Sequence, residues 1–240
     1  MGAPFLRALG RGTHRKGRER APQERPQVPQ TSGSRSDGDP SWGTWVRFRG
    51  PSRGRSPGVL RADHAVQAVV GETARVDILV IQGDIVRADV DAIVTAANHA
   101  LVGGGGVDGA VHAAAGPELL AALRPLAPCQ AGDAVVTPAF RLGPRVRHVV
   151  HAVGPRYRVD KPAAELLASA YQASLARCDE VGAASVAFPA LSTGAFGYPL
   201  LEACQVSVKA LRDAQTDVRH CLLVAFDDRS RKFWERALAS

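Results

Sequence analysis

The spacing of apolar and polar residues changes about a quarter of the way along the chain. Up to residue 65 no apolar period persists, and Gly, Pro, Ser, Gln and Arg dominate the composition. Beyond that point, short apolar runs alternate with longer segments whose apolar residues recur every three or four positions. We therefore expect residues 1–65 to form a disordered leader and residues 66–240 to fold as one domain.

The apolar runs predict strands, and the longer periodic segments predict helices. The expected strands are residues 76–81, 92–96, 134–138, 146–153, 185–189 and 221–226. The expected helices are residues 107–115, 117–124, 163–181, 199–214 and 229–238. Because strands that alternate with helices form a largely parallel sheet covered on both faces, the pattern predicts an α/β fold. Ligand sites in such sheets lie beyond the carboxyl ends of the strands.

Four consecutive glycines, residues 103–106, follow the second expected strand and open a helix. Glycine has no Cβ, so the backbone there can approach a ligand closely and adopt a positive φ. The N–H groups of Gly105, Gly106 and Val107 are expected at the helix N-terminus, which favours an anion and most naturally a diphosphate. A flexible loop is the alternative, and this stretch alone does not name a nucleotide.

Two further polar segments also follow expected strands. After the strand at 185–189, Ser192 and Thr193 offer hydroxyls, and the next three residues offer backbone N–H groups. Two phosphate-binding loops on one sheet edge suit a ligand with two adjacent phosphates. After the first strand, the carboxylate of Asp84 can accept a hydrogen bond from an exocyclic amine such as that of adenine, or it can cap a helix.

Taken together, these segments resemble the macrodomain family, and within it the MacroD-type ADP-ribosyl hydrolases and O-acetyl-ADP-ribose deacetylases. The matching segments are 83–85 (G-D-I), 90–94 (V-D-A-I-V), 96–98 (A-A-N), 101–109, His112, 114–116, 151–155 (H-A-V-G-P), 187–194 and 197–199. The resemblance implies a three-layer α/β/α fold with a mixed, largely parallel central sheet. It also implies a hydrolase that removes ADP-ribose from esters on Asp or Glu side chains, deacetylates O-acetyl-ADP-ribose, or does both. A reader module that binds ADP-ribose without turnover is the alternative.

The resemblance further implies roles for single residues, with no cofactor. Asn98 would contact the distal ribose, and Asp108 would lie beside the scissile bond. There Asp108, a phosphate of the ligand or both would accept a proton from the attacking water. The other implied ligand contacts are Asp84, Ile85 and Phe226 at the adenine, Gly104, Gly105, Gly106, Val107, Ser192, Thr193, Gly194 and Ala195 around the diphosphate, and Phe196 at the distal ribose.

Two residues leave alternatives open. Thr95 stands where hydrolases of this type usually carry Asn, which keeps the reader alternative open. His112 follows Asp108 by four positions, so both side chains can lie on one helical face. They could act as a pair, or Asp108 could cap the helix while His112 packs in the interior.

The basic charge of the chain belongs to the leader rather than to the domain. Residues 1–70 hold 13 Lys and Arg against 5 Asp and Glu, whereas the remaining residues hold 17 against 18. This nearly neutral domain argues against a nucleic-acid-binding fold. A weak, salt-sensitive contact between the leader and a polyanion is therefore the third candidate function.

The cysteines and the apolar runs bear on the compartment. The cysteines are Cys129, Cys178, Cys204 and Cys221, and neither they nor the histidines show the spacing of a metal site. We expect buried free thiols, no metal, and ADP-ribose or an ADP-ribosylated protein as the partner. No apolar run reaches the roughly 20 residues that span a bilayer, and the N-terminus lacks a secretory apolar core. We expect a cytoplasmic monomer without a membrane partner, and the Arg-rich leader leaves a mitochondrial presequence open.

Overall fold

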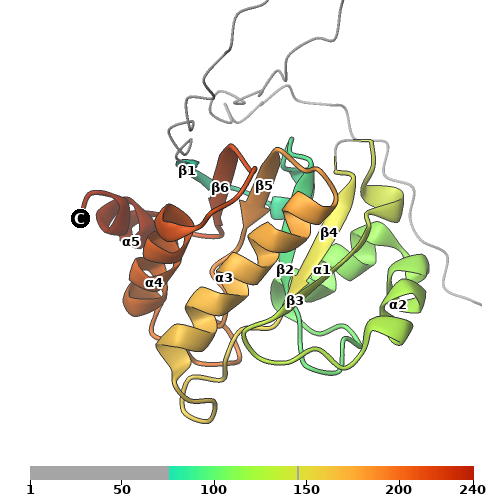
Figure 1. The fold of residues 1–240 in the computed structure, drawn as a ribbon, viewed down its shortest axis with the longest axis horizontal. Coiled ribbons are helices and arrows are strands. Elements are labelled where there is room, and N and C mark those ends of the chain that lie inside the picture. The colour runs from blue at the N-terminus through green and yellow to red at the C-terminus, as the bar shows by residue number, and fades with distance from the viewer. Residues whose placement is uncertain (1–75, 145) are drawn as a thin grey trace, which may run out of the picture. The chain divides into compact units, whose positions relative to one another are not determined.

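The computed structural model describes residues 76–144 and 146–240 of the chain. The expected leader and its boundary near residue 66 lie outside the described residues. Figure 1 shows a central sheet with helices packed against it. Within the described ranges, no helix is long and apolar enough to cross a membrane.

Six strands form the sheet, in the spatial order β1-β6-β5-β2-β4-β3. All neighbouring pairs are parallel except β3 and β4, which are antiparallel. The expected mixed, largely parallel sheet is therefore confirmed. The strands are β1 (Asp77–Gln82), β2 (Ala92–Ala96), β3 (Ala134–Pro138), β4 (His148–Ala152), β5 (Ser185–Phe188) and β6 (His220–Ala225).

The helices form a layer on each face of the sheet. On one face α3, α4 and α5 pack around the larger apolar cluster, which includes Leu167, Val208 and Trp234. On the other face α1 and α2 pack around a second cluster, which includes Val111 and Leu119. In Figure 1 α3 crosses in front of the strands. The helices are α1 (Gly106–Ala115), α2 (Pro117–Leu123), α3 (Ala163–Glu180), α4 (Leu200–Asp213) and α5 (Asp228–Leu238).

Local sequence signals account for several helix boundaries. Pro117 occupies the first turn of α2, where its missing N–H costs nothing, and Gly116 separates α1 from α2 with φ of 88°. Asp227 begins α5 by accepting a hydrogen bond from the backbone N–H of Ser230 at 2.8 Å, while the Ser230 hydroxyl completes a capping box. The expected and observed helices therefore differ by one residue at most at each end.

The connections that follow β2 and β5 diverge at the carboxyl edge of the sheet. β2 and β5 are neighbours, but α1 follows β2 onto one face and α4 follows β5 onto the other. Two adjacent strands whose helices depart to opposite faces leave a cleft between the loops at their carboxyl ends. Both helix N-termini lie at this edge, so the fold itself provides a place for an anionic ligand.

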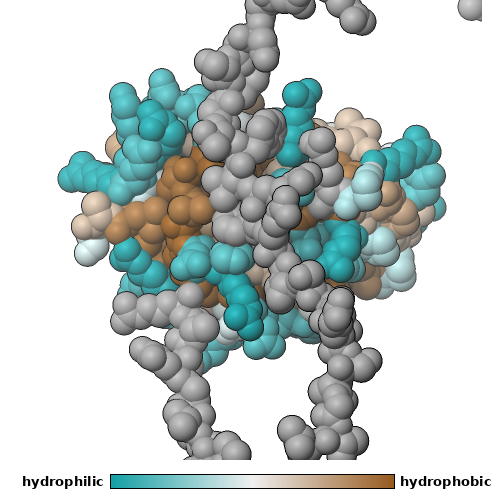
Figure 2. Space-filling model, turned by 90° about the horizontal axis from the view of Figure 1, so that it is seen from above, coloured by the Kyte–Doolittle hydropathy of each residue, from teal (hydrophilic) through white to brown (hydrophobic). Residues whose placement is uncertain are grey.

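Asp91 ties three strands together at the opposite, amino-terminal edge. Its carboxylate accepts hydrogen bonds from the backbone N–H groups of Ala184 and Ser185 at 3.0 and 3.1 Å. The Ser185 hydroxyl and the Arg147 guanidinium donate to it as well, at 3.0 and 2.5 Å. Burial alone would raise the pKa of Asp91, but these donors outweigh burial and lower it. In Figure 2, which views the molecule from above, areas of hydrophobic surface lie inward of hydrophilic side chains that line the margins.

Candidate functional site

The segments singled out in the sequence leave the sheet at one edge. Asp84 follows β1, and Phe226 follows β6. The loop of residues 192–196, here called the S-T-G loop, follows β5, and the glycine-rich loop of residues 103–106 follows β2. Because these four strands are consecutive neighbours in the sheet, their loops form a row in the same order. A ligand lying along this edge would therefore meet the Asp84 and Phe226 end first and the two glycine-containing loops next.

Asp84 and Phe226 stand side by side because β1 and β6 are paired, and the N–H of Gly83 donates to the carbonyl of Ala225 at 3.0 Å. Asp84 accepts a hydrogen bond from the N–H of Val86 at 3.1 Å and so caps a short 3-10 helix, as its alternative interpretation predicted. Its side chain is nevertheless half exposed, and Phe226 is 92% exposed. A carboxylate and a bare aromatic ring are both open to solvent at this end.

The 3-10 helix itself was not expected. It covers Ile85–Arg87, and Ile85 is buried in the apolar cluster beneath α1 and α2. The Ile85 side chain therefore anchors the segment, and only its backbone lies near the carboxyl edge. The contact of Ile85 with adenine stays a prediction.

The glycine-rich loop is fixed from two sides. The Asn98 side chain donates from Nδ2 to the carbonyl of Gly103 at 2.7 Å, and its Oδ1 accepts from the N–H of Val102 at 3.5 Å. On the side of the loop that faces α1, a Cβ on Gly109 would lie only 2.7 Å from the carbonyl oxygen of Gly104. Gly103 and Gly106 take φ values of 81° and 60°, which other residues rarely adopt. The loop is therefore held in one conformation by Asn98 and by α1.

Asp108 lies in the first turn of α1 but does not cap it. The N-cap is Gly105, which makes no side-chain cap. The Asp108 carboxylate turns toward β2 instead, where Oδ1 accepts a hydrogen bond from Thr95 Oγ1 at 3.0 Å. The alternative in which Asp108 caps the helix is wrong, because the carboxylate makes this contact with the sheet instead.

His112 lies on the same face of α1, as the four-residue spacing predicted. Its Nε2 stands 3.8 Å from Asp108 Oδ1, and the Asp108 side chain is 3% exposed. Burial raises the pKa of Asp108, while the hydrogen bond from Thr95, the charge of His112 and the N–H of Gly104 oppose that rise. Asp108 is thus a buried carboxylate whose protonation depends on three neighbours.

A second histidine completes a buried polar cluster that sequence spacing did not reveal. His151 on β4 pairs in register with Thr95, and its Nε2 lies 3.0 Å from the hydroxyl of Thr137. Burial, together with the charge of His112, lowers the pKa of His151 to about 3. The sequence position of His151 does not indicate that its side chain lies near Asp108. Only the register of β2 with β4 brings the two side chains together.

Side chains of Asp108, His112 and His151 each offer an atom within 4.8 Å of the others. Such side chains can hold a metal ion, although tetrahedral zinc with bonds of about 2.0–2.1 Å keeps its ligand atoms about 3.4 Å apart. His112 Nε2 and Asp108 Oδ1 are 3.8 Å apart, and the hydroxyl of Thr95 already occupies Oδ1. The hydrogen bonds of this cluster run to the hydroxyls of Thr95 and Thr137, and we assign no ion to it.

In the S-T-G loop the two hydroxyls point inward. Ser192 is 5% exposed with φ of 65°, and its Oγ has no hydrogen-bond partner among the described residues. A Cβ on Gly154 would lie 2.1 Å from that Oγ, so the absence of a side chain at Gly154 makes room for Ser192. Thr193 Oγ1 donates to the carbonyl of Ala190 at 2.9 Å. The exposed part of this loop is Gly194 and Ala195, which leaves its backbone as the surface offered to a ligand.

Tyr157 holds the far end of the same loop, a role that the sequence did not indicate. Its N–H donates to the carbonyl of Phe196 at 3.0 Å, and its hydroxyl donates to Glu202 at 3.1 Å. Its ring packs against Tyr198 with centroids 4.6 Å apart. Tyr198 is buried. Phe196 is thereby tied to the segment that follows β4.

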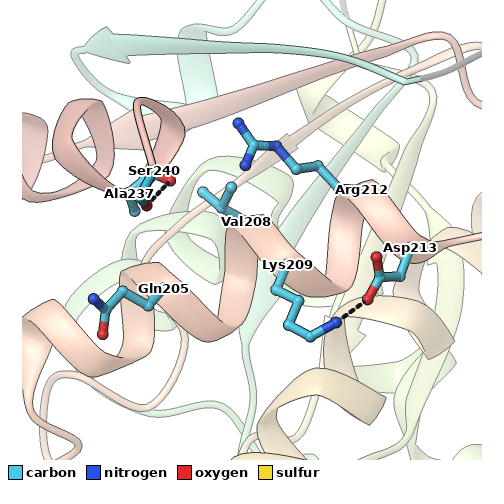
Figure 3. Close-up of a pocket in the computed structure, with 7 residues that line it drawn as sticks. All are labelled: Gln205, Val208, Lys209, Arg212, Asp213, Ala237 and Ser240. Carbon is cyan, nitrogen blue, oxygen red and sulfur yellow. Dashed lines mark hydrogen bonds and ion pairs between the residues drawn. The ribbon is translucent and has the colours of Figure 1, made fainter.

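A separate depression lies near the end of α4 and the end of α5, away from these loops (Figure 3). Its charged side chains are already engaged: Lys209 binds Asp213, and Arg212 donates to the carbonyl of Leu238 at 2.6 Å. Because α4 runs away from the carboxyl edge, its last turn lies at the opposite edge of the sheet. This depression takes no part in the candidate site.

Comparisons with known proteins agree with the geometry. Residues 94–207 match the family model of the Macro domain. A macro domain-containing protein of Lactiplantibacillus plantarum is 44% identical over 170 residues, which are 69% of this chain and 98% of that protein. The chain belongs to the macrodomain family. This macrodomain is also 44% identical to an O-acetyl-ADP-ribose deacetylase of Salmonella gallinarum, over 66% of this chain and 92% of that protein.

Solved macrodomain structures share the fold. A Trypanosoma brucei macrodomain in complex with ADP-ribose matches with a TM-score of 0.62 and 33% identity, over 67% of this chain and 68% of that chain. The expected family and the three-layer α/β/α arrangement of this macrodomain are thus confirmed. Its four cysteines are free and buried, as expected.

Proposed function

We propose that this macrodomain binds ADP-ribose and hydrolyses ADP-ribosyl esters, either on Asp and Glu side chains of proteins or in O-acetyl-ADP-ribose. The observation that carries the proposal is Asp108, a buried carboxylate directly below the glycine-rich loop, oriented by Thr95 and adjacent to His112. The name of the Salmonella gallinarum relative supports the reaction class. The Trypanosoma brucei complex supports the ligand.

The ligand would follow the row of loops along the carboxyl edge. Its adenine would lie between Phe226 and the carboxylate of Asp84, which would accept a hydrogen bond from the exocyclic amine. The diphosphate would lie between two backbones, residues 104–107 and residues 192–196. Backbone N–H groups at helix N-termini favour such an anion without any cationic side chain. The distal ribose would then reach Asn98 and Asp108.

The chemistry needs a water molecule and a proton acceptor. The water oxygen attacks the carbonyl carbon or the anomeric carbon while the water proton passes to Asp108 or to a phosphate oxygen of the ligand. After attack at the carbonyl carbon the ester bond breaks and the proton is returned to the departing ribose oxygen, whereas after attack at the anomeric carbon the acid leaves as a carboxylate. Burial raises the pKa of Asp108, which improves it as a base over an exposed aspartate. Backbone N–H groups of the loops stabilise the negative charge that develops.

The decisive experiment measures release of ADP-ribose from a protein automodified on Glu and Asp. Asp108→Ala is expected to slow release by about 100-fold or more, the usual contribution of a general base, while calorimetry shows ADP-ribose affinity close to wild type. Asp213→Ala, an exposed carboxylate at the opposite edge, is the matched control and should release at the wild-type rate. Normal turnover by Asp108→Ala would show that another group accepts the proton.

The second candidate function is a reader that binds ADP-ribose without turnover. It is favoured by Thr95, which stands where related hydrolases usually carry Asn. Tight binding by calorimetry together with no release by the wild type would establish the reader, and Thr95→Asn would then be the variant that tests whether hydrolysis can be restored.

We further propose that the chain is cytoplasmic, because four buried free thiols fit a reducing compartment. We also propose that it is a monomer. Fractionation of cells and light scattering test these two points.

A further inference from the structure

We propose that Thr95 is a positioning residue whose hydroxyl holds the Asp108 carboxylate in the orientation that hydrolysis needs. The inference rests on the proposed hydrolase function. It concerns a residue that cannot touch the ligand, since Thr95 is 0% exposed on the central strand β2. The side-chain contact that links Thr95 to the site is its hydrogen bond to Asp108.

The strand directs the Thr95 side chain toward α1. Side chains alternate across a strand, so Thr95 shares a face with Ile93, and Ile93 packs in the cluster formed with α1 and α2. Asp108 lies in the first turn of α1, over that face. The contact between Thr95 Oγ1 and Asp108 Oδ1, 3.0 Å long, therefore links the sheet to the first turn of the helix that carries the candidate base.

Thr95 makes the side-chain hydrogen bond that Asp108 receives within the described part of the chain. His112 Nε2 is 3.8 Å from the same oxygen, which is beyond hydrogen-bond length. The N–H of Gly104 is the other donor, and it belongs to the glycine-rich loop. Thr95 is the donor that lies on the central sheet, so it ties the carboxylate to the sheet rather than to the loop.

The same bond affects the protonation of Asp108. A hydrogen bond to the charged form of a carboxylate favours that form, so the Thr95 hydroxyl lowers the pKa of Asp108 against the opposing effect of burial. The titratable groups that face Asp108 are His112 on α1 and His151 on β4. Because burial lowers the pKa of His151 to about 3, His151 is neutral at the pH of hydrolysis. Loss of the hydroxyl would leave His112 as the side chain that supports the ionised carboxylate.

This role explains in physical terms how threonine can stand at position 95, where hydrolases of this type usually carry asparagine. An amide at this position would offer an N–H donor, and threonine offers an O–H donor from a shorter side chain. The 3.0 Å bond shows that threonine reaches Asp108 from the strand. The substitution therefore retains a donor to the carboxylate rather than removing it.

The test uses Thr95→Val, which keeps the shape and removes the hydroxyl, and Thr95→Ser, which keeps the hydroxyl. With wild type releasing ADP-ribose, Thr95→Val is expected to lower kcat about 10- to 100-fold, with KM and ADP-ribose affinity within about twofold of wild type. The acidic limb of its pH–rate profile should move to higher pH, because the pKa of Asp108 rises without the donor. Thr95→Ser should recover most of the wild-type rate and the wild-type profile.

A second readout separates this inference from the hydrolase proposal. The carboxyl carbon of Asp108 is titrated by NMR in the wild type and in Thr95→Val, and its pKa should be higher in the variant whether or not the protein hydrolyses anything. If Thr95→Val does not fold, Thr95→Ser and Thr95→Ala make the same comparison, since they differ by one hydroxyl. An unchanged titration curve together with an unchanged kcat would overturn the role of Thr95. A wild type without turnover would overturn the hydrolase and leave the titration as the test.

Discussion

Replacing Gly109 with alanine should weaken ADP-ribose binding by displacing the glycine-rich loop. Gly109 lies inside α1, and a Cβ there would be 2.7 Å from the carbonyl oxygen of Gly104. Ordinary van der Waals contact begins at 3.4 Å, so Gly104 must move away by about 0.7 Å. The N–H of Gly104 also donates to Asp108, and the displacement therefore reaches the candidate base.

Two opposing contributions determine how much Gly109→Ala changes the free energy of unfolding. Alanine is about 1 kcal/mol better than glycine inside a helix. Overpacking of a close contact costs about 1–3 kcal/mol. The free energy of unfolding should therefore fall by about 0–2 kcal/mol, and Tm by at most about 8 °C for a domain of this size. If the ligand requires the original position of the loop, the strain of about 1–3 kcal/mol is instead subtracted from the binding free energy, a loss of about 5- to 150-fold in affinity.

Calorimetric titration with ADP-ribose and thermal unfolding together check the Gly109→Ala prediction. Gly143→Ala is the matched control: its φ is −62°, its nearest neighbouring atoms would be 3.6 Å away, and it lies before β4 at the other edge of the sheet. The control should bind like the wild type. Wild-type affinity and wild-type Tm for Gly109→Ala would refute the reasoning, because the loop would then have absorbed the new methyl group without cost.

Two further predictions address the ends of the site and of the sheet. Phe226→Ala should leave Tm unchanged, because the ring is 92% exposed, while ADP-ribose affinity measured by calorimetry falls about 2- to 10-fold through the loss of stacking on the adenine. Asp91→Asn should lower the free energy of unfolding in urea at pH 7 by about 1–3 kcal/mol, because the charge is lost and one of the two accepting oxygens becomes an amide NH2 that cannot accept. Since the folded pKa of Asp91 is lowered, its stabilisation is complete above the unfolded value of 3.8 and disappears as pH falls through the folded pKa. The stabilities of wild type and Asp91→Asn should therefore converge as the pH falls through the lowered folded pKa of Asp91, and a gap that stays constant as the pH falls below 3.8 would contradict this account.

Elements whose boundaries depend on local chemistry could be predicted from the sequence. The strands at 92–96 and 134–138 were expected with their observed limits, because a short aliphatic run between polar or glycine-containing segments defines a strand by itself. The start of α2 follows from Pro117. The chemistry-bearing loops were also placed correctly at the carboxyl edge, since parallel strands bring their carboxyl ends to one side.

Contacts between distant segments could not be predicted, even where each residue had been noticed. Thr95 was recognised as an unusual residue, but its bond to Asp108 depends on how α1 packs over β2. Tyr157 reaches Phe196 only because the segments after β4 and β5 meet above the end of β2. For Asp84 the sequence offered a helix cap and a ligand contact as alternatives, and the observed cap leaves half of the side chain exposed, so both can hold together.

The pairing of β1 with β6 has a consequence for synthesis of the protein on the ribosome. β1 has β6 as its neighbour in the sheet, with Asp77 opposite His220, so nearly the whole domain must be translated before β1 gains a partner. At about 5–20 residues per second, that wait lasts roughly 7–30 s. During it β1 presents unpaired backbone edges, and β5 presents one as well once residues 185–188 have been made, so other chains can join them. The nascent domain is therefore most vulnerable to aggregation immediately before residues 220–225 emerge, and a chaperone that shields these edges would act at that moment.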